Sequence, residues 1–327
     1  MDPMSRPLTV ALAALLLAAG CAGSPSPSSS PPGPTAVANA CVPGGSPAAT
    51  TYPGWPGAGT GDVVPLLVSQ ELAVGPNRFL FTLIDPQNRL VAAAEVGVDV
   101  SFFQLARDAD TPAAEAAATF LAAEEGGLYV AEAAFECSGD WGAELVARVP
   151  GREDRLARVQ FQVLAESSTP GIGEVVPAVD TPTAVSSQQI AAISTDTAPD
   201  PDFYTASVAD ALDQDRPFAL IFATPAFCQT RACGPTLETV KSVATPYKER
   251  MTFIHVEPYR LKMTDTGLQP ELGPEGGLQT VASVTAFALR SEPFIFVMDS
   301  AGRVTAKFEG LAGQEELRRA FDAVVGG

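Results

Sequence analysis

The feature of this sequence that most constrains its fold is a buried strand that leads through a cysteine into a helix. Residues 218–223 form an apolar run between two prolines, which predicts a buried strand. Cys228 follows, and from Gln229 to about Thr245 the apolar side chains recur at helical spacing. The N-terminus of a helix stabilises a thiolate through its unpaired N–H groups and its dipole. We therefore expect Cys228 to be a nucleophile.

A second segment, Arg290 to Val304, completes a recognisable pattern. Pro293 precedes an apolar strand, a turn with Gly302 and a second strand, and residues 314–325 have the spacing of an amphipathic helix. Taken with the Cys228 segment, this order resembles the thioredoxin-like superfamily over roughly the last third of the chain. The resemblance implies an α/β fold in which Pro293 is a cis-proline that abuts Cys228 and shapes the groove for a substrate strand.

The sequence departs from that family at its cysteines. Cys228 and Cys233 are separated by four residues instead of two, and no acidic residue lies in the strand 218–223. In an ideal helix their Cα atoms would be about 8.7 Å apart, whereas a disulfide needs less than about 7 Å. The first turn must therefore unwind if the bridge forms. The spacing also resembles peroxiredoxins of the bacterioferritin-comigratory class, but Thr224 lies one residue too far from Cys228 for their motif.

The resemblance implies a role for each residue of the site. Cys228 would attack and Cys233 would resolve the mixed disulfide, while Arg231 would lower the pKa of Cys228 by its positive charge. Glu292, beside Pro293, would raise the thiol pKa or carry protons, or else it is a solvated loop residue. The alternatives are a thiol peroxidase, or an inert thioredoxin-like assembly module in which both cysteines are structural.

The chain's one histidine, His255, bears on metal binding. With a single histidine and no clustered acids, we expect no metal site and no cofactor. A Cu(I) carrier is a further alternative, because thioredoxin-like copper chaperones use two cysteines and a distant histidine. Their histidine comes later in the domain, so an ordinary strand residue is the default interpretation of His255.

The N-terminus indicates export. Residues 1–20 contain an early arginine and an apolar run, and Cys21 follows Gly20, as in bacterial lipoprotein signal peptides. We expect a mature protein that begins at lipidated Cys21 and is held at the extracytoplasmic face of the cell membrane. A transmembrane helix is the alternative, although the run is shorter than a span requires.

The rest of the chain divides by composition. We predict a tether rich in proline, serine and glycine at residues 21–61, an all-β sandwich at 62–166, a linker at 167–201 and the thioredoxin-like domain at 202–327. Six strands are predicted in the sandwich, which loosely resembles small immunoglobulin-like extracytoplasmic domains. Cys41 and Cys137 are candidates for a structural disulfide.

Charge limits the partners. The net charge of −18 and the pI near 4.4 argue against binding to nucleic acid. The sequence therefore predicts a membrane-anchored thiol–disulfide oxidoreductase whose partners are extracytoplasmic proteins with thiols or disulfides.

Overall fold

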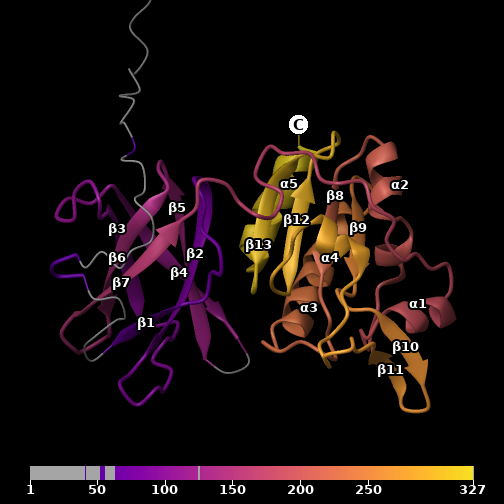
Figure 1. Ribbon diagram of the computed structural model, residues 1–327, viewed down its shortest axis with the longest axis horizontal. Coiled ribbons are helices and arrows are strands. Elements are labelled where there is room, and N and C mark those ends of the chain that lie inside the picture. The colour runs from indigo at the N-terminus through magenta and orange to yellow at the C-terminus, as the bar shows by residue number, and fades with distance from the viewer. Residues whose placement is uncertain (1–40, 42–51, 56–62, 124–125, 327) are drawn as a thin grey trace, which may run out of the picture. The chain divides into compact units, whose positions relative to one another are not determined.

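The computed structural model describes residues 41, 52–55, 63–123 and 126–326. The predicted signal peptide, Cys21 and most of the tether lie outside these residues. Within the described part of the chain, no helix is long and apolar enough to cross a membrane. Residues 41–327 form one compact unit, which contains a β-sheet domain followed by an α/β domain (Figure 1).

Seven antiparallel strands form the first domain, in the order β1-β2-β5-β4-β3-β6-β7. The six strands predicted from sequence each overlap one of them, and β4 is the additional one. Their bounds are β1 Val64–Leu67, β2 Gly75–Ile84, β3 Gly97–Gln104, β4 Ala114–Ala122, β5 Gly127–Phe135, β6 Gly139–Arg148 and β7 Arg155–Val163.

This sheet folds over a single aromatic core. Phe79 on β2 contacts Phe102 on β3 and Phe161 on β7, with ring centroids 5.1 Å apart in each pair. Neither β3 nor β7 is hydrogen-bonded to β2, so these contacts join opposite halves of the folded sheet. Each inward-facing aromatic ring removes a large apolar surface from water. The domain is thus an antiparallel β-sheet that folds over an aromatic core; we refer to it below as the sandwich.

Part of the predicted tether packs on this sandwich. Trp55 is only 3% exposed, its ring centroid lies 4.9 Å from that of Phe103, and the Arg158 guanidinium lies over its ring. The Tyr52 hydroxyl donates a hydrogen bond to Asp140 at 2.9 Å. The prediction of a tether reaching residue 61 is therefore wrong for residues 52–55, because two aromatic side chains are buried more favourably than they are solvated.

A disulfide joins Cys41 to Cys137 in the structure, with Cα atoms 5.5 Å apart. That separation lies within the usual range for such bridges. Peptide mapping of the non-reduced protein is the direct test of this pairing.

The second domain has a four-stranded sheet in the order β13-β12-β8-β9. Only β8 and β9 are parallel; β12 runs antiparallel to both of its neighbours. The strands are β8 Phe218–Phe222, β9 Thr252–Val256, β12 Phe294–Met298 and β13 Val304–Glu309, with a hairpin of β10 Leu261–Thr264 and β11 Gly267–Pro270. The helices are α1 Ser187–Ile193, η1 Pro201–Tyr204, α2 Val208–Asp213, α3 Cys233–Ala244, η2 Thr245–Tyr247, α4 Ala282–Ala286 and α5 Gln314–Val325.

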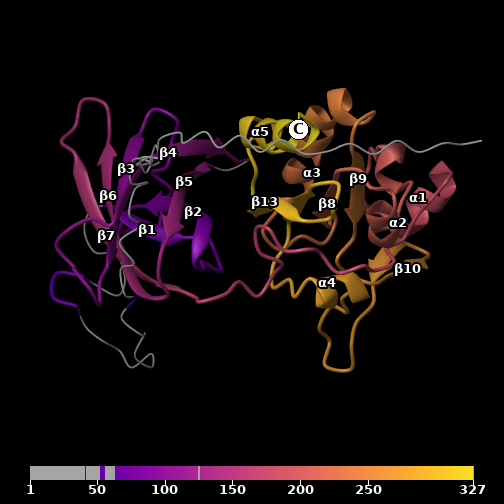
Figure 2. The same cartoon turned by 90° about the horizontal axis from the view of Figure 1, so that it is seen from above.

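Both faces of this sheet are covered by helices. Alternate residues of β8 point to opposite sides, so Ile221 packs in the core beneath α3 and α5, whereas Phe222 packs in the core beneath α2 and α4. Figure 2 shows α3 and α5 on one side of the strands and α4 on the other. The strand order, the covering helices and the antiparallel β12–β13 hairpin make this domain thioredoxin-like, in agreement with the sequence resemblance.

Part of the predicted linker, residues 167–201, packs against the α/β domain in the structure. Val176 and Ile190 are each 3% exposed and belong to the two cores of the α/β domain. Residues 173–176 are hydrogen-bonded to the β13 turn region, through Gly173 to Val304 and Val176 to Gly302. Scattered apolar residues in a segment rich in proline and threonine are thus enough to extend the domain toward residue 173.

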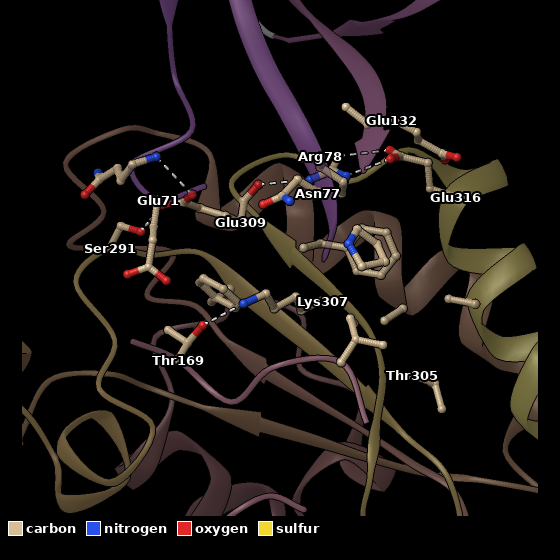
Figure 3. Close-up of a pocket in the computed structure, with 18 of the residues that line it drawn as sticks. Glu71, Asn77, Arg78, Glu132, Thr169, Ser291, Thr305, Lys307, Glu309 and Glu316 are labelled. Atoms are coloured by element: carbon tan, nitrogen blue, oxygen red, sulfur yellow. Dashed lines mark hydrogen bonds and ion pairs between the residues drawn. The ribbon is translucent and has the colours of Figure 1, made fainter. Parts of the chain in front are cut away.

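A buried ion pair connects the sandwich to the thioredoxin-like domain. The Arg78 guanidinium on β2 donates to both carboxylate oxygens of Glu316 on α5, at 2.8 and 3.1 Å, and also to the carbonyls of Glu309 and Leu311. Arg78, Glu309 and Glu316 line a cavity of about 630 Å³ (Figure 3). Each of the three guanidinium nitrogens of Arg78 thus has a carboxylate or carbonyl partner, and charge-assisted hydrogen bonds of this kind are the strong ones.

Candidate functional site

The two cysteines of the predicted site are bridged. Cys228 lies in the loop after β8, Cys233 is the first residue of α3, and a disulfide joins them with Cα atoms 5.9 Å apart. The prediction of a helix from Gln229 is therefore wrong by one turn. Residues 229–232 form a non-helical turn in which Arg231 adopts a left-handed φ of 58°. The turn brings the two Cα atoms within the distance that a disulfide allows.

The two sulfurs differ in their surroundings. Cys233 is fully buried against the α3 core, whereas Cys228 is partly exposed. The backbone N–H of Cys233, at the N-terminus of α3, lies 3.2 Å from the Cys228 Sγ and donates to it. This N–H and the helix dipole favour negative charge on Cys228 once the bridge is opened. The geometry therefore gives Cys228 the accessible, activated sulfur and Cys233 the protected one.

The loop before β12 faces this pair. The Glu292–Pro293 peptide bond is cis, which is the conformation that the resemblance implies. The Thr230 hydroxyl lies 3.3 Å from the Cys228 Sγ and 3.4 Å from the Glu292 carbonyl, to which it donates. The cysteine loop and the cis-proline loop are thus in direct contact.

Glu292 brings a carboxylate to the sulfurs. One of its oxygens and the Sγ atoms of Cys228 and Cys233 all lie within 4.8 Å of one another. Burial raises the pKa of Glu292, although the Tyr259 hydroxyl donates to it at 3.0 Å and a backbone N–H of Gln229 donates as well. Burial and the neighbouring carboxylate raise the pKa of Tyr259 to about 12. Of the two interpretations of Glu292, the solvated loop residue does not fit this position.

His255 takes no part in the site. Its ring is buried, with Nε2 2.9 Å from the Ala223 carbonyl and Nδ1 2.8 Å from the Tyr204 hydroxyl. Since Nε2 must donate to the carbonyl, Nδ1 accepts from the tyrosine, and burial lowers the pKa of His255 to about 4. The copper alternative needs this histidine as a ligand, and both of its nitrogens are occupied.

A second buried acid, Glu257, lies below the cysteine loop. It follows β9 and is 5% exposed. Its Oε1 accepts from the backbone N–H and the hydroxyl of Thr195, at 2.7 and 2.6 Å, and the Thr195 hydroxyl accepts from Ala226 just before Cys228. Burial raises the pKa of Glu257. Sequence reasoning looked for an acid in β8 and missed this one, which directly follows the neighbouring strand β9, although its place at the end of an apolar run was a usable signal.

A groove of about 350 Å³ adjoins the site. Thr230, Arg231 and Glu292 line it on the cysteine side, and apolar side chains of the sandwich line it on the other side, namely Val68, Leu90, Ala123 and Leu128. Arg231 therefore faces the groove beside the cysteines. The sandwich contribution has no counterpart in the sequence motifs, since contacts between distant domains leave no local pattern.

Comparisons with known proteins address the two domains separately. Residues 60–146 match the family model described as YtkA-like, which spans most of the sandwich. Among solved structures, the chain is similar to MTB DsbF, described in its mixed oxidized and reduced forms, with 21% identity over 34% of this chain and 81% of that chain and a TM-score of 0.25. It is also similar to the PmoD soluble domain from Methylocystis sp., with 12% identity over 32% of this chain and 95% of that one and a TM-score of 0.22. A search of the curated proteins gave no match.

Proposed function

We propose that this protein is an extracytoplasmic thiol–disulfide oxidoreductase that acts on protein substrates through Cys228 and Cys233. The observation that carries the proposal is the asymmetric pair: a partly exposed sulfur bridged to a buried one at the N-terminus of α3, facing Glu292 and Pro293. A purely structural bridge needs neither the asymmetry nor the carboxylate.

The chemistry is two thiol–disulfide exchanges. A substrate thiolate attacks the Cys228 sulfur, the bond to Cys233 breaks, and Cys233 leaves as a thiolate that takes up a proton. A second substrate thiolate then attacks the substrate sulfur of the mixed disulfide and releases Cys228, so the substrate gains the disulfide and the enzyme the two thiols. In the reverse direction Cys228 attacks a substrate disulfide and Cys233 resolves it. Glu292 is the group near enough to the sulfurs to exchange these protons.

The groove supplies the substrate-binding surface. A substrate segment beside Pro293 would have its reacting cysteine at Cys228 and an adjacent side chain between Arg231 and the apolar wall of the sandwich. Apolar side chains gain most from this wall, because their burial is favourable whereas polar groups would lose water. The sandwich thereby becomes part of the enzyme's specificity.

Two other activities have less support. Thr224, the nearest candidate for a peroxidatic threonine, is completely buried, so it does not stand beside the accessible Cys228 sulfur. A Cu(I) carrier of this type would need His255 as a ligand, and both ring nitrogens of His255 already contact other groups. An inert assembly module is the outcome that remains if neither cysteine exchanges.

Attachment to the membrane through lipidated Cys21 forms part of the proposal. An oxidising compartment suits both cysteine pairs that the structure bridges. Fractionation of cells expressing Cys21→Ser tests the anchor: we expect release from the membrane fraction, and unchanged membrane association would refute lipidation.

The exchange mechanism is tested by trapping. Cys233→Ser should accumulate mixed disulfides with a disulfide-containing model protein and with cellular partners, because the Cys228 thiolate attacks their disulfides but no Cys233 thiol resolves the intermediate. Cys228→Ser is the matched variant and should trap far less. Free thiols are alkylated first, and the mixed disulfides are then quantified on non-reducing gels as bands that disappear when reductant is added. Equal trapping by the two variants, or none by either, would contradict the proposal.

A further inference from the structure

Three donor groups converge at the cysteine pair from separate parts of the chain. Cys228 comes from the loop after β8, Cys233 from the start of α3 and Glu292 from the loop before β12, and their ligand atoms lie within 4.8 Å of one another. Two sulfurs and a carboxylate oxygen form a donor set that divalent zinc accepts, at about 2.3 Å for sulfur and 2.0–2.2 Å for oxygen. A tetrahedral ion would need the sulfurs about 3.8 Å apart, which requires the bridge to be open.

The groups around these donors already orient them. The Tyr259 hydroxyl donates to Oε2 of Glu292 at 3.0 Å. A backbone N–H of Gln229 also donates to this carboxylate, and the Cys233 N–H donates to the Cys228 Sγ at 3.2 Å. Hydrogen bonds of this kind fix the direction of metal ligands and strengthen binding.

We propose that the reduced form of this site binds one zinc ion through Cys228, Cys233 and Glu292. A substrate dithiol first transfers two electrons and two protons to the disulfide, becoming a disulfide itself and leaving two thiols on the enzyme. Zinc then displaces both thiol protons and is held by two thiolates and one carboxylate, with the fourth position open to water. Once the ion dissociates, a substrate disulfide can take two electrons and two protons from the pair, and the resulting enzyme disulfide no longer offers thiolates to zinc.

The donor set distinguishes zinc from Cu(I). Cu(I) is satisfied by the two soft thiolates alone, whereas zinc uses the harder carboxylate oxygen as well. Zinc binding therefore depends on Glu292. The consequence for activity rests on the proposed function: a zinc-bound pair cannot attack a substrate disulfide, so zinc holds the reduced enzyme inactive until it leaves.

The test is an anaerobic zinc titration of the purified full chain, reduced and freed of metal, against a chromogenic zinc indicator. We expect one ion per reduced chain and none for the oxidised chain. Glu292→Gln should bind at least tenfold more weakly, and Tyr259→Phe should weaken binding in the same direction. Glu275→Gln, a substitution at an exposed acid outside the site, is the matched control and should equal the wild type.

Cobalt substitution provides a second measurement that reports the ligands directly. A sulfur-to-cobalt charge-transfer band with the intensity of two thiolates is expected in the wild type. Three results would each overturn the zinc site. They are zinc binding by Glu292→Gln with wild-type affinity, equal zinc binding by the oxidised and reduced chains, and binding of Cu(I) by a chain that does not bind zinc. Trapping by Cys233→Ser needs no metal, so intact trapping without zinc binding overturns the zinc site alone, and zinc binding without trapping overturns the exchange activity alone.

Discussion

At the scale of single residues, the thioredoxin-like domain buries ionisable groups whose charge is set by their partners. His255 is completely enclosed, and its two nitrogens contact the Ala223 carbonyl and the Tyr204 hydroxyl. Burial of the ring disfavours its charged form, and this is the main cause of the lowered pKa of His255. Its environment therefore favours the neutral form strongly.

This arrangement predicts a loss of stability in acid. The pKa of His255 falls from 6.5 to about 4 on folding, so its contribution to the free energy of unfolding is complete above pH 6.5 and is lost progressively as the pH falls from 6.5 to about 4. The shift corresponds to about 3 kcal/mol. In urea unfolding measured between pH 7 and 4, the wild type should lose about this much more free energy of unfolding than His255→Gln, which keeps a donor and an acceptor but does not titrate. Parallel pH profiles for the two proteins would contradict the assignment.

Residue identities at the site were largely predictable, and their spatial neighbours were not. Cys228, Cys233, Glu292 and Pro293 stand next to strand and helix signals that can be recognised locally. Tyr259, which orients Glu292, lies 33 residues before it in the sequence. No spacing rule links two loops that meet only after the sheet has formed.

At the scale of elements, the cysteine turn shows how a covalent constraint overrides helical periodicity. The apolar spacing predicts a helix from Gln229, yet α3 begins at Cys233 while the bridge is closed. Strand β4, by contrast, was not predicted from the sequence. Five of its nine residues are alanine, a residue with little strand propensity. It is a strand because β3 and β5 pair with it on both sides.

The cysteine turn should respond to its redox state. Reduction removes the constraint that holds Arg231 in the left-handed conformation, which costs a non-glycine residue energy. In the metal-free reduced form, residues 229–232 can then add a turn to α3. We expect their amides to exchange several-fold faster with solvent in the oxidised form than in the reduced form, measured by hydrogen–deuterium exchange. Residues of α5 serve as the internal reference and should be unaffected, and a turn equally protected in both states would rule out this change.

At the scale of the whole molecule, the sandwich is fixed to the redox domain next to its active site. Glu309 on β13 accepts from the backbone of Gln70 in the sandwich at 3.1 Å and from the Ser291 hydroxyl at 2.7 Å. Ser291 directly precedes Glu292, so one carboxylate ties the sandwich to the cis-proline loop (Figure 3). The apolar wall of the sandwich therefore borders the same groove as Thr230 and Glu292.

That wall should select substrates without changing the chemistry. Leu90 lines the groove and is 47% exposed, so Leu90→Asp should leave the overall fold intact. Exchange with a small disulfide of glutathione size should stay within about twofold of the wild-type rate, because such a substrate reaches only the cysteines. A peptide disulfide with leucine beside its cysteine should react about tenfold more slowly, since losing one apolar contact of this size costs about 1.5 kcal/mol. Leu156→Asp, at a 58% exposed position of β7 outside the groove, is the matched control. Equal rates for the two variants with the leucine peptide would remove the sandwich from substrate recognition.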